Sequence, residues 1–491
     1  MSATAAAELL VPAIRWHDDG TGYAAEREGI ERALELGVGG VMLFGGPVAA
    51  VRELTAELRE RSRIPLLVAA DMERGAGQQF SGATGLPPLA ALGSLGDLDA
   101  VRRAARLTAQ EARDLGINWC CAPVCDLDLE PQNPIIGTRA FGADPGLVFE
   151  QVAEWIDGCQ AEGVLACAKH FPGHGRTRSD SHAGLPVVTA SANELHSIDL
   201  APFRTAIDAG VASVMTAHVS YPSLDASGAA ATLSSPILHD LLRTRLGFDG
   251  LVVTDALIME GVLASGSEAQ ASVAALAAGC DLLLYPGDLS GVERALTQAV
   301  RAGQLDPEAL RAATRRRARW ADWAAVGVRG TAPTETDTEW AAIDAERCIH
   351  LVRGARTFPL GAATDVAIVD DDLGGPYPAP SREPFVRALG AFGARVQTVE
   401  ALSPDLHSPL VIALFGDVRA WKGRPGYSSA ALARVAALCE QATMQARDAL
   451  VVQFSHPRHA SAIPPCAAVV CAWGGDAAMQ EAAARWLLRA R

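Results

Sequence analysis

Short apolar runs rich in β-branched residues recur along the first part of the chain, and amphipathic segments separate them. Runs of this length bounded by polar or glycine-containing segments are typical of buried parallel strands. The intervening segments contain good helix formers, as in AEREGIERALELG and ELTAELRERSR. The runs lie at 11–15, 39–44, 65–72, 117–124, 164–171, 211–218, 251–257 and 281–287.

Eight strand-and-helix units in succession predict an α/β fold with a TIM-like (β/α)8 barrel at residues 1–323. A doubly wound sheet is the alternative, although such sheets rarely need eight units of this regularity. The segment 324–342 carries Gly, Pro and Thr without strong periodicity, and is interpreted as a linker. A smaller α/β sandwich domain with a mostly parallel sheet is predicted at 343–491, from apolar runs at 365–372, 395–400, 410–417, 449–456 and 467–473.

The charge balance argues against some classes of partner. A formal net charge of −15 disfavours a nucleic acid or an anionic membrane surface, since both attract basic patches. No stretch of about 18 residues is free of polar groups, so no membrane span is predicted. The one basic run, RAATRRRAR at 311–319, falls in a helical pattern and is interpreted as a solvated helix face. The sequence makes no prediction of oligomeric state.

The cysteines and the N-terminus favour a cytoplasmic protein. The N-terminal segment has no basic start before its apolar run and no clean small-residue cleavage site, so no signal peptide is predicted. No cysteine spacing matches a zinc site, and neither a disulfide framework, a metal nor a cofactor is expected. Several of the ten cysteines instead lie in or beside apolar runs, where a thiol behaves as a small hydrophobe: Cys120, Cys121, Cys125, Cys167, Cys280 and Cys471.

Polar residues gather where the apolar runs end. In a barrel of parallel strands these positions share one rim, and that rim carries the functional groups. Charged side chains are costly to bury, so their repetition on one rim indicates a site. The ends of the third to seventh runs contribute Asp71 and Glu73, then Asp126, then Lys169 and His170, then His218, and finally Asp255.

Asp255 is the most informative of these residues. It terminates LVVTD, where a carboxylate would face the barrel mouth, and an ionised aspartate can act as a nucleophile. Asp is also a good N-cap, and taken by itself a cap of the next helix is the more common role. The other polar groups of the rim favour the nucleophile.

The segment KHFPGHGRTRSDSHAGLP at 169–186 is too polar for a core and suits a mobile loop over a bound substrate. Asp180 and His182 are close enough in sequence for the carboxylate to hold the imidazole in one tautomer and favour its charged form. Such a pair can donate and then accept a proton. An exposed surface loop is the alternative, and no spacing of its histidines and carboxylates supports a metal site.

KHFPGHG followed by Asp-Ser-His, with VVTDAL about seventy residues later, resembles the family 3 glycoside hydrolases. Within that family it is most similar to the bacterial β-N-acetylhexosaminidase branch. The similarity extends through GVGGVMLFGG, PLLVAADME, APVCDLD, NPIIGTRAFG, MTAHVSYP and ATLSSP, and so covers almost all of the expected barrel. The C-terminal GGDAAMQEAAARWL resembles the second domain of two-domain members.

The resemblance implies a retaining, exo-acting β-N-acetylglucosaminidase that acts on small glycosides or cell-wall fragments through a covalent glycosyl-enzyme. It implies Asp255 as nucleophile and His182, supported by Asp180, as acid/base. By the same resemblance the residues that hold the sugar are Asp71, Arg139, Lys169 and His170. Three alternatives remain open: a phosphorylase using the same residues, a β-glucosidase or xylosidase, and a non-catalytic sugar-binding protein.

Some positions depart from the family pattern. The usual Asp-Gln-Glu-Gly-Gly-Arg is Asp-Met-Glu-Arg-Gly-Ala here, which places Arg74 at a glycine and Ala76 at the arginine. Arg176 replaces the aspartate that commonly follows KHFPGHG. These arginines could form a basic edge for an acidic aglycone, or they could be surface residues in local ion pairs.

Overall fold

The computed structural model describes residues 6–264, 266–326, 333–354, 363–375, 380–391, 395–398, 408–465 and 468–489. The chain divides into two compact units. The first comprises the residues up to Thr334 except two short segments, and the second comprises those segments, Gly85–Asp97 and Pro134–Arg139, with the chain from Glu335 onward.

The described part of the first unit is built on eight parallel strands in a ring. β1 and β2 are one strand interrupted at Pro12, so nine labels describe eight strands. Sheets of order β2-β3-β4-β5, β6-β7-β8 and β1-β9 are joined by parallel bridges between Trp119 and Leu165 and between Val253 and Leu282, which completes the ring. The (β/α)8 prediction is therefore confirmed. The strands are β1 (Leu10–Val11), β2 (Ala13–Arg15), β3 (Gly40–Phe44), β4 (Leu67–Ala70), β5 (Trp119–Cys120), β6 (Cys167–Phe171), β7 (Ser213–Thr216), β8 (Leu251–Thr254) and β9 (Leu283–Leu284).

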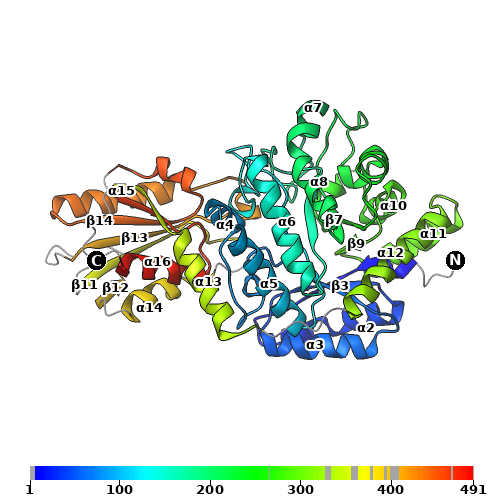
Figure 1. Ribbon diagram of the computed structural model, residues 1–491, viewed down its shortest axis with the longest axis horizontal. Coiled ribbons are helices and arrows are strands. Elements are labelled where there is room, and N and C mark those ends of the chain that lie inside the picture. The colour runs from blue at the N-terminus through cyan, green and yellow to red at the C-terminus, as the bar shows by residue number, and fades with distance from the viewer. Residues whose placement is uncertain are drawn as a thin grey trace. The chain divides into compact units, whose positions relative to one another are not determined.

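Helices form the outer layer of the ring (Figure 1). Their ends follow from local sequence: Ser267 and Gln270 form a capping box that starts α10, and Gly37 and Gly279 adopt the left-handed conformation that ends α2 and α10. Alternate strand residues point inward and fill the barrel, among them Met42, Trp119 and Val253. The main barrel helices are α2 (Arg27–Leu36), α3 (Val48–Arg61), α5 (Leu98–Asp114), α6 (Pro145–Ala161), α8 (Ala201–Asp208), η6 (Pro236–Arg245), α10 (Glu268–Ala278), α11 (Leu289–Arg301) and α12 (Pro307–Val326).

The basic run at 311–319 lies on α12 and is only partly solvated. Arg311 pairs with Glu308 on the exposed side. Arg317 is buried and donates to the carbonyl of Pro65 at 2.8 Å. The interpretation as a solvated face is therefore wrong for Arg317, because its guanidinium satisfies a backbone carbonyl at the start of the third strand.

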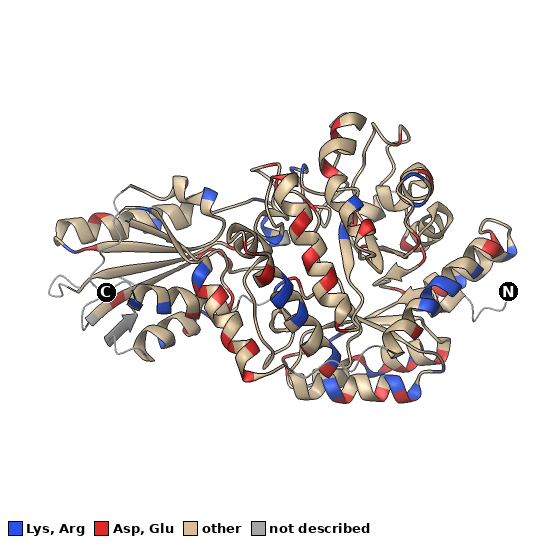
Figure 2. Ribbon diagram, viewed as in Figure 1, with Lys and Arg blue, Asp and Glu red and all other residues tan. Residues whose placement is uncertain are grey.

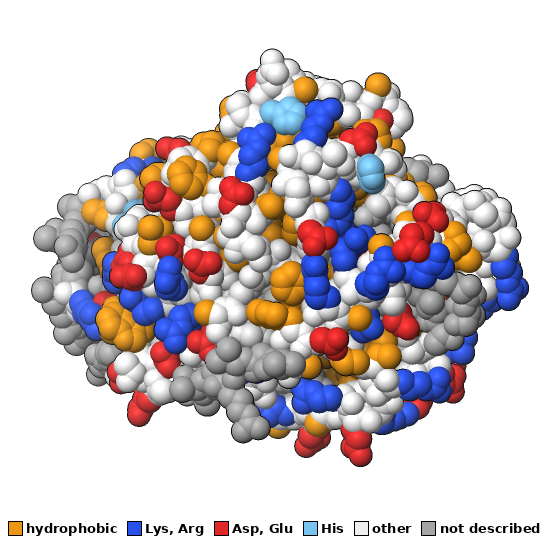
Figure 3. All heavy atoms as spheres, turned by 45° about the vertical axis from the view of Figure 1, so that its right-hand side comes forward, with side chains coloured by type: hydrophobic (Ala, Val, Ile, Leu, Met, Phe, Trp, Pro, Cys, Tyr) orange, Lys and Arg blue, Asp and Glu red, His pale blue; other side chains and the backbone are white. Residues whose placement is uncertain are grey.

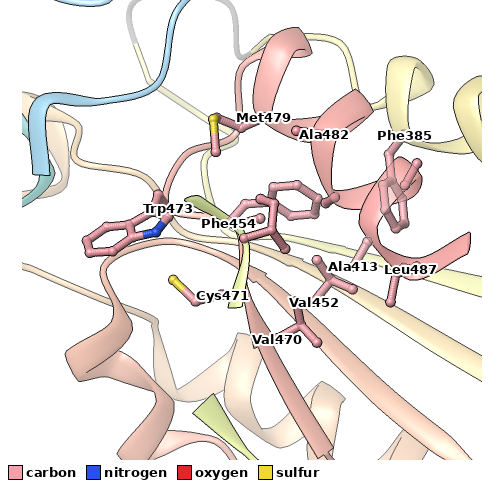
Figure 4. Close-up of a cluster of buried hydrophobic side chains, with 14 of the residues drawn as sticks. Phe385, Ala413, Val452, Phe454, Val470, Cys471, Trp473, Met479, Ala482 and Leu487 are labelled. Carbon is pink, nitrogen blue, oxygen red and sulfur yellow. The ribbon is translucent and has the colours of Figure 1, made fainter. Parts of the chain in front are cut away.

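Within its described residues, the second unit is a six-stranded sheet between helices, of order β10-β15-β14-β13-β11-β12. β10 is antiparallel to β15 and every other pairing is parallel, as predicted for the smaller α/β sandwich. Helix α15 (Ser429–Met444) covers one face, and α13 (Glu335–Cys348), α14 (Glu383–Ala391) and α16 (Ala477–Arg489) cover the other, where the core of Figure 4 lies. The strands are β10 (His350–Arg353), β11 (Ala363–Asp370), β12 (Arg395–Thr398), β13 (Leu410–Phe415), β14 (Ala449–Phe454) and β15 (Ala468–Cys471).

The region expected to be a linker contains helical structure. Helix α12 extends to Val326 and α13 begins at Glu335. Residues 327–332 of the expected linker lie outside the described residues, as do 399–400 and 467 of the expected strand runs. Ala341, Ala345 and Cys348 of α13 are buried, which explains why this segment is helical despite its weak periodicity.

Both signs of charge are spread over the helices of each unit (Figure 2), and the face drawn in Figure 3 likewise mixes basic with acidic side chains. Ion pairs on the barrel exterior, such as Arg61 with Glu31 and Glu57, are part of this mixture. No helix among the described residues is both long and apolar enough to cross a membrane.

Candidate active site

The predicted rim residues lie at or just beyond the carboxyl ends of three strands of the ring. Asp71 follows β4, Lys169 and His170 lie in β6, and Asp255 follows β8. Because all strands of the ring are parallel, these ends share one rim. The fold therefore places four of the predicted residues on the same side of the barrel.

Lys169 joins two carboxylates of the neighbouring loop. Its Nζ atom lies 2.8 Å from Oδ1 of Asp71 and 2.8 Å from Oε1 of Glu73. The lysine side chain is only 2% exposed, whereas that of Asp71 is 29% exposed. Lys169 thus supplies one positive charge between two carboxylates and orients Asp71, whose carboxylate remains partly open to solvent.

Asp126, at the end of the fourth predicted run, organises two histidines. Its carboxylate accepts the Nδ1 proton of His170 at 2.7 Å and the backbone N–H of His174 at 2.5 Å. Burial alone would raise the pKa of Asp126, but the charges and hydrogen bonds of His170 and His174 outweigh it and lower that pKa. Asp126 therefore fixes the ring of His170. The sequence placed it on the rim but did not predict this role.

His174 supports the loop that follows β6. Its Nδ1 lies 2.7 Å from Oγ1 of Thr177, and its Nε2 lies 3.0 Å from Oγ of Ser181. Burial lowers the pKa of His174 to about 4, so its ring is neutral at physiological pH. It connects the start of the loop to the Asp-Ser-His triplet.

Asp180 and His182 are in direct contact. Nδ1 of His182 lies 2.7 Å from Oδ1 of Asp180, which also accepts the backbone N–H of His182 at 2.9 Å. The carboxylate is buried, while the imidazole is 51% exposed. A buried carboxylate that holds one ring nitrogen fixes the tautomer and stabilises the imidazolium.

Asp255 is held ionised by its surroundings. Burial would raise its pKa, but the charges of His170, His218 and His182 prevail and lower the pKa of Asp255 to about 2. Its Oδ1 accepts the N–H of Ala256 at 2.8 Å. Asp255 does not cap the next helix, because α9 (Glu260–Leu263) begins later, with Met259 as N-cap. His170 and His182 are thus near enough to Asp255 for their charges to act on its carboxylate.

His218 supports the segment that carries Asp255. Its Nε2 proton is donated to the carbonyl oxygen of Ala256 at 3.1 Å, and its Nδ1 lies 2.7 Å from Oγ1 of Thr232. Burial lowers the pKa of His218, although the charge of Asp255 opposes that shift. The hydrogen bond from His218 fixes the backbone immediately after Asp255.

Arg139 is not grouped with these residues. It lies in the short segment 134–139, which belongs to the second compact unit. Its backbone N–H donates to the carbonyl of Ile136 at 2.9 Å, and its Nη1 donates to the carbonyl of Ile135 at 3.1 Å. Its predicted contact with the sugar therefore stays a prediction.

Arg176 forms an ion pair rather than a basic edge. Its Nε donates to both carboxylate oxygens of Asp199 at 2.9 Å, and Asp199 is buried. Burial raises the pKa of Asp199, against the opposing effect of Arg176. This contact anchors the loop after β6. At Arg74, the backbone N–H donates to Oε1 of Gln78 at 2.9 Å.

A cationic group on the rim was missed at the end of the first run. The guanidinium of Arg15 lies 4.4 Å from the ring centre of Phe44 and 5.0 Å from that of Tyr285, and its Nε donates to the Tyr285 hydroxyl at 2.8 Å. Arg15 pairs with Phe44 across β2 and β3. The arginine that ends VPAIR was the available signal.

Within the described part of the chain, no group of three or more His, Cys, Asp or Glu side chains is arranged to hold a metal ion. Cys120, Cys121, Cys125 and Cys167 are buried near the barrel interior and form no disulfide.

The curated relatives are glycosidases. The chain is 39% identical over 284 residues to a Cellulomonas fimi protein described as "Beta-N-acetylglucosaminidase/beta-glucosidase"; the match covers 56% of this chain and 50% of that protein. It is 37% identical over 270 residues to a Nitrosomonas eutropha "Beta-hexosaminidase", which covers 53% of this chain and 77% of the relative. The chain thus spans half the length of the first relative.

A solved structure and a family model agree with these relatives. A glycoside hydrolase family 3 β-N-acetylglucosaminidase from Paenibacillus sp. str. FPU-7 superposes with a TM-score of 0.87 at 29% identity, covering 100% of this chain and 97% of that one. The model of the glycosyl hydrolase family 3 N-terminal domain matches residues 6–319, which include the whole ring of strands. The chain therefore belongs to glycosyl hydrolase family 3.

Proposed function

We propose that the protein is a retaining, exo-acting β-N-acetylhexosaminidase that removes terminal N-acetylglucosamine from small glycosides. The observation that carries the proposal is the contact between Asp180 and His182 on the same rim as Asp255, whose pKa is lowered to about 2. An ionised carboxylate and a carboxylate-supported imidazole together provide a nucleophile and an acid/base.

In the first step Asp255 attacks the anomeric carbon. Its Oδ1 accepts the Ala256 N–H, so Oδ2 is the oxygen assigned to the attack. His182 as imidazolium, stabilised by Asp180 at Nδ1, donates its Nε2 proton to the departing oxygen. The glycosidic bond breaks, a glycosyl ester forms on Asp255, and the configuration at the anomeric carbon is inverted.

In the second step the now neutral His182 takes a proton from water at Nε2. The water oxygen attacks the anomeric carbon, and the carboxylate of Asp255 leaves. The second inversion restores the original configuration, so the product retains it. His182 ends the cycle charged, as it began.

The sugar is held by groups around the nucleophile. Asp71, oriented by Lys169, accepts hydrogen bonds from sugar hydroxyls, and His170 is oriented for its own contact by Asp126. Arg139 is assigned to the same sugar by the family pattern. The preference for a 2-acetamido sugar is supported by the Asp-Ser-His triplet and by the description of the similar Paenibacillus structure as a β-N-acetylglucosaminidase.

The substrates that suit this proposal are small glycosides, including cell-wall fragments, with no nucleic acid involved. A cytoplasmic location is part of the same proposal, because reduced buried thiols such as Cys120 and Cys167 are usual in a reducing compartment. Cell fractionation tests the location independently of activity.

The function is tested with a panel of aryl β-glycosides, with and without a 2-acetamido group, in the presence and absence of phosphate. The proposal expects release of N-acetylglucosamine with retained configuration. A preference for plain glucosides would move the enzyme to the β-glucosidases, and release of a sugar 1-phosphate would make it a phosphorylase. Sugar binding without turnover of any activated glycoside would indicate a non-catalytic protein.

The roles of Asp255 and His182 are separated by azide rescue. Asp255→Ala, acting on an activated aryl N-acetylglucosaminide, should give the α-glycosyl azide, because azide replaces the nucleophile in a single inversion. His182→Ala should give the β-glycosyl azide, because azide attacks the ester formed on Asp255. Near-wild-type hydrolysis by Asp255→Ala, in folded protein, would contradict the assignment of the nucleophile.

A further inference from the structure

Gly261 lies six positions after Asp255, in the first turn of α9. Its backbone N–H donates to the carbonyl oxygen of Ser181 at 2.9 Å. Ser181 stands between Asp180 and His182, so this hydrogen bond joins the segment after the nucleophile to the centre of the Asp-Ser-His triplet.

There is no space for a side chain at Gly261. A Cβ atom there would lie 2.8 Å from the carbonyl oxygen of Ser181, and 3.0 Å from those of Gly184 and His218. All three atoms belong to the backbone and cannot rotate away as a side-chain end would. A glycine is therefore required by close approach of backbones rather than by a left-handed conformation.

Three segments meet at this glycine. One is the loop that carries Asp180 and His182, the second is the end of the sixth predicted run at His218, and the third is the segment that follows Asp255. His218 in turn donates to the carbonyl of Ala256, so the second and third segments are joined twice.

Several other contacts of the loop lie nearer its start. Arg176 binds Asp199, and Asn133 donates to the carbonyl of His174 at 3.0 Å. Gly175 packs against the backbone of Leu127. These contacts fix the base of the loop, whereas the hydrogen bond from Gly261 acts on the backbone of the triplet itself.

We propose that Gly261 is a positioning residue. It holds the Asp180-Ser181-His182 triplet against the segment that follows Asp255, and so sets the distance between His182 and Asp255. The inference rests on the proposed function. Gly261 touches neither substrate nor the reacting atoms; it acts through the backbone of Ser181. A displacement of about 1 Å in a catalytic group can cost roughly 100-fold in rate.

Gly261→Ala tests this role through the leaving group. A displaced general acid matters most when the departing oxygen needs a proton, as in a phenyl glycoside, and least when it leaves unaided, as in a dinitrophenyl glycoside. We expect kcat/KM to fall roughly 10- to 100-fold for phenyl N-acetylglucosaminide. For the dinitrophenyl substrate it should change by less than about 3-fold, because formation of the ester then needs no proton.

Gly184→Ala is the matched control. Gly184 lies in the same loop, but a Cβ atom there would meet nothing within 4 Å. This variant should keep the wild-type rate on both substrates. Equal losses in Gly184→Ala and Gly261→Ala, or equal losses of Gly261→Ala on both substrates, would overturn the proposal.

A double-mutant cycle with His182→Ala shows whether Gly261 acts through the histidine. In that background Gly261→Ala should cause no further loss on the phenyl substrate. The same loss in both backgrounds would indicate a general structural role and overturn the inference. If His182→Ala by itself shows no dependence on the leaving group, the acid/base assignment of the proposed function fails instead.

Hydrogen exchange of the wild-type protein keeps the proposal testable if Gly261→Ala does not fold. The amide of Gly261 is expected to exchange slowly, because Ser181 accepts its proton. Exchange at the rate of an unprotected amide under native conditions would show that the hydrogen bond from Gly261 to Ser181 is not formed, and would overturn the proposal.

Discussion

The same carboxylate oxygen of Asp180 contacts His182 twice, once through the imidazole Nδ1 at 2.7 Å and once through the backbone N–H at 2.9 Å. The two contacts fix the imidazole of His182 relative to the His182 backbone, so the ring has little freedom to turn. A general acid placed on a loop usually needs such a constraint, because proton transfer requires hydrogen-bond geometry with the departing oxygen.

Replacement of Asp180 by Asn tests how much the negative charge of Asp180 contributes to catalysis. The amide oxygen can still accept from Nδ1, but it no longer stabilises the imidazolium. We expect kcat on phenyl N-acetylglucosaminide to fall by roughly 100-fold or more, within the range of general acid/base contributions. The dinitrophenyl substrate should be affected much less in the first chemical step. A uniform loss on both substrates in Asp180→Asn would show that the carboxylate serves folding rather than proton transfer.

The ionisation of Asp255 leads to a prediction about acid pH. Nearby histidine charges lower its pKa from 3.8 to about 2, so the nucleophile stays ionised as the pH falls through the ordinary range of an aspartate. The rate of trapping of Asp255 by an activated fluorosugar should therefore show no loss with a midpoint near 3.8, as long as circular dichroism shows folded protein. A midpoint at the ordinary aspartate value would contradict the electrostatic picture of the site.

Much of the barrel was predictable because its signals are local. Each buried strand is a short apolar run, and the residue that ends the run is placed on the rim by the chain itself, as for Asp71 and Asp255. The direct pair of Asp180 and His182 was likewise predictable from adjacency in sequence. The helix at Glu335–Cys348 was not predictable in this way, because its burial depends on packing within the second unit.

Long-range contacts explain what the sequence left open. The segments 85–97 and 134–139 group with the second unit through contacts that no local pattern encodes. Asp126 becomes a partner of two histidines only when the segment after β5 lies beside β6. The choice between a basic edge and an ion pair at Arg176 likewise depended on Asp199, which lies in a different segment.

Loss of the ion pair between Arg176 and Asp199 should be costly. Asp199 is buried and its pKa is already raised by that burial, so Arg176→Met leaves a desolvated carboxylate without a cation. We expect a loss of about 3 kcal/mol in the free energy of unfolding at neutral pH, measured in urea. The loss should shrink at lower pH, because protonation of Asp199 removes the uncompensated charge.

The matched control for this prediction is Arg178→Met, in the same loop. Arg178 pairs with Glu130, but its side chain is 79% exposed. Exposed pairs of this kind contribute little to stability, so the variant should be close to wild type in its free energy of unfolding. If the two variants are equally stable, the buried pair does not anchor the loop.

His174 should make the stability of the protein depend on pH. Its pKa in the fold is about 4, well below the ordinary 6.5, because burial disfavours the charged ring. Between these values the unfolded chain binds a proton that the fold does not, so stability is lost as the pH falls from 6.5 to 4. The full effect is about 3 kcal/mol.

His174→Gln should lower stability at pH 7 and flatten the dependence of stability on pH between 4 and 6.5. His239→Gln, at an exposed position, should leave that dependence unchanged. Urea titrations across this pH range measure both, and an unaltered slope in His174→Gln would mean that another group titrates there.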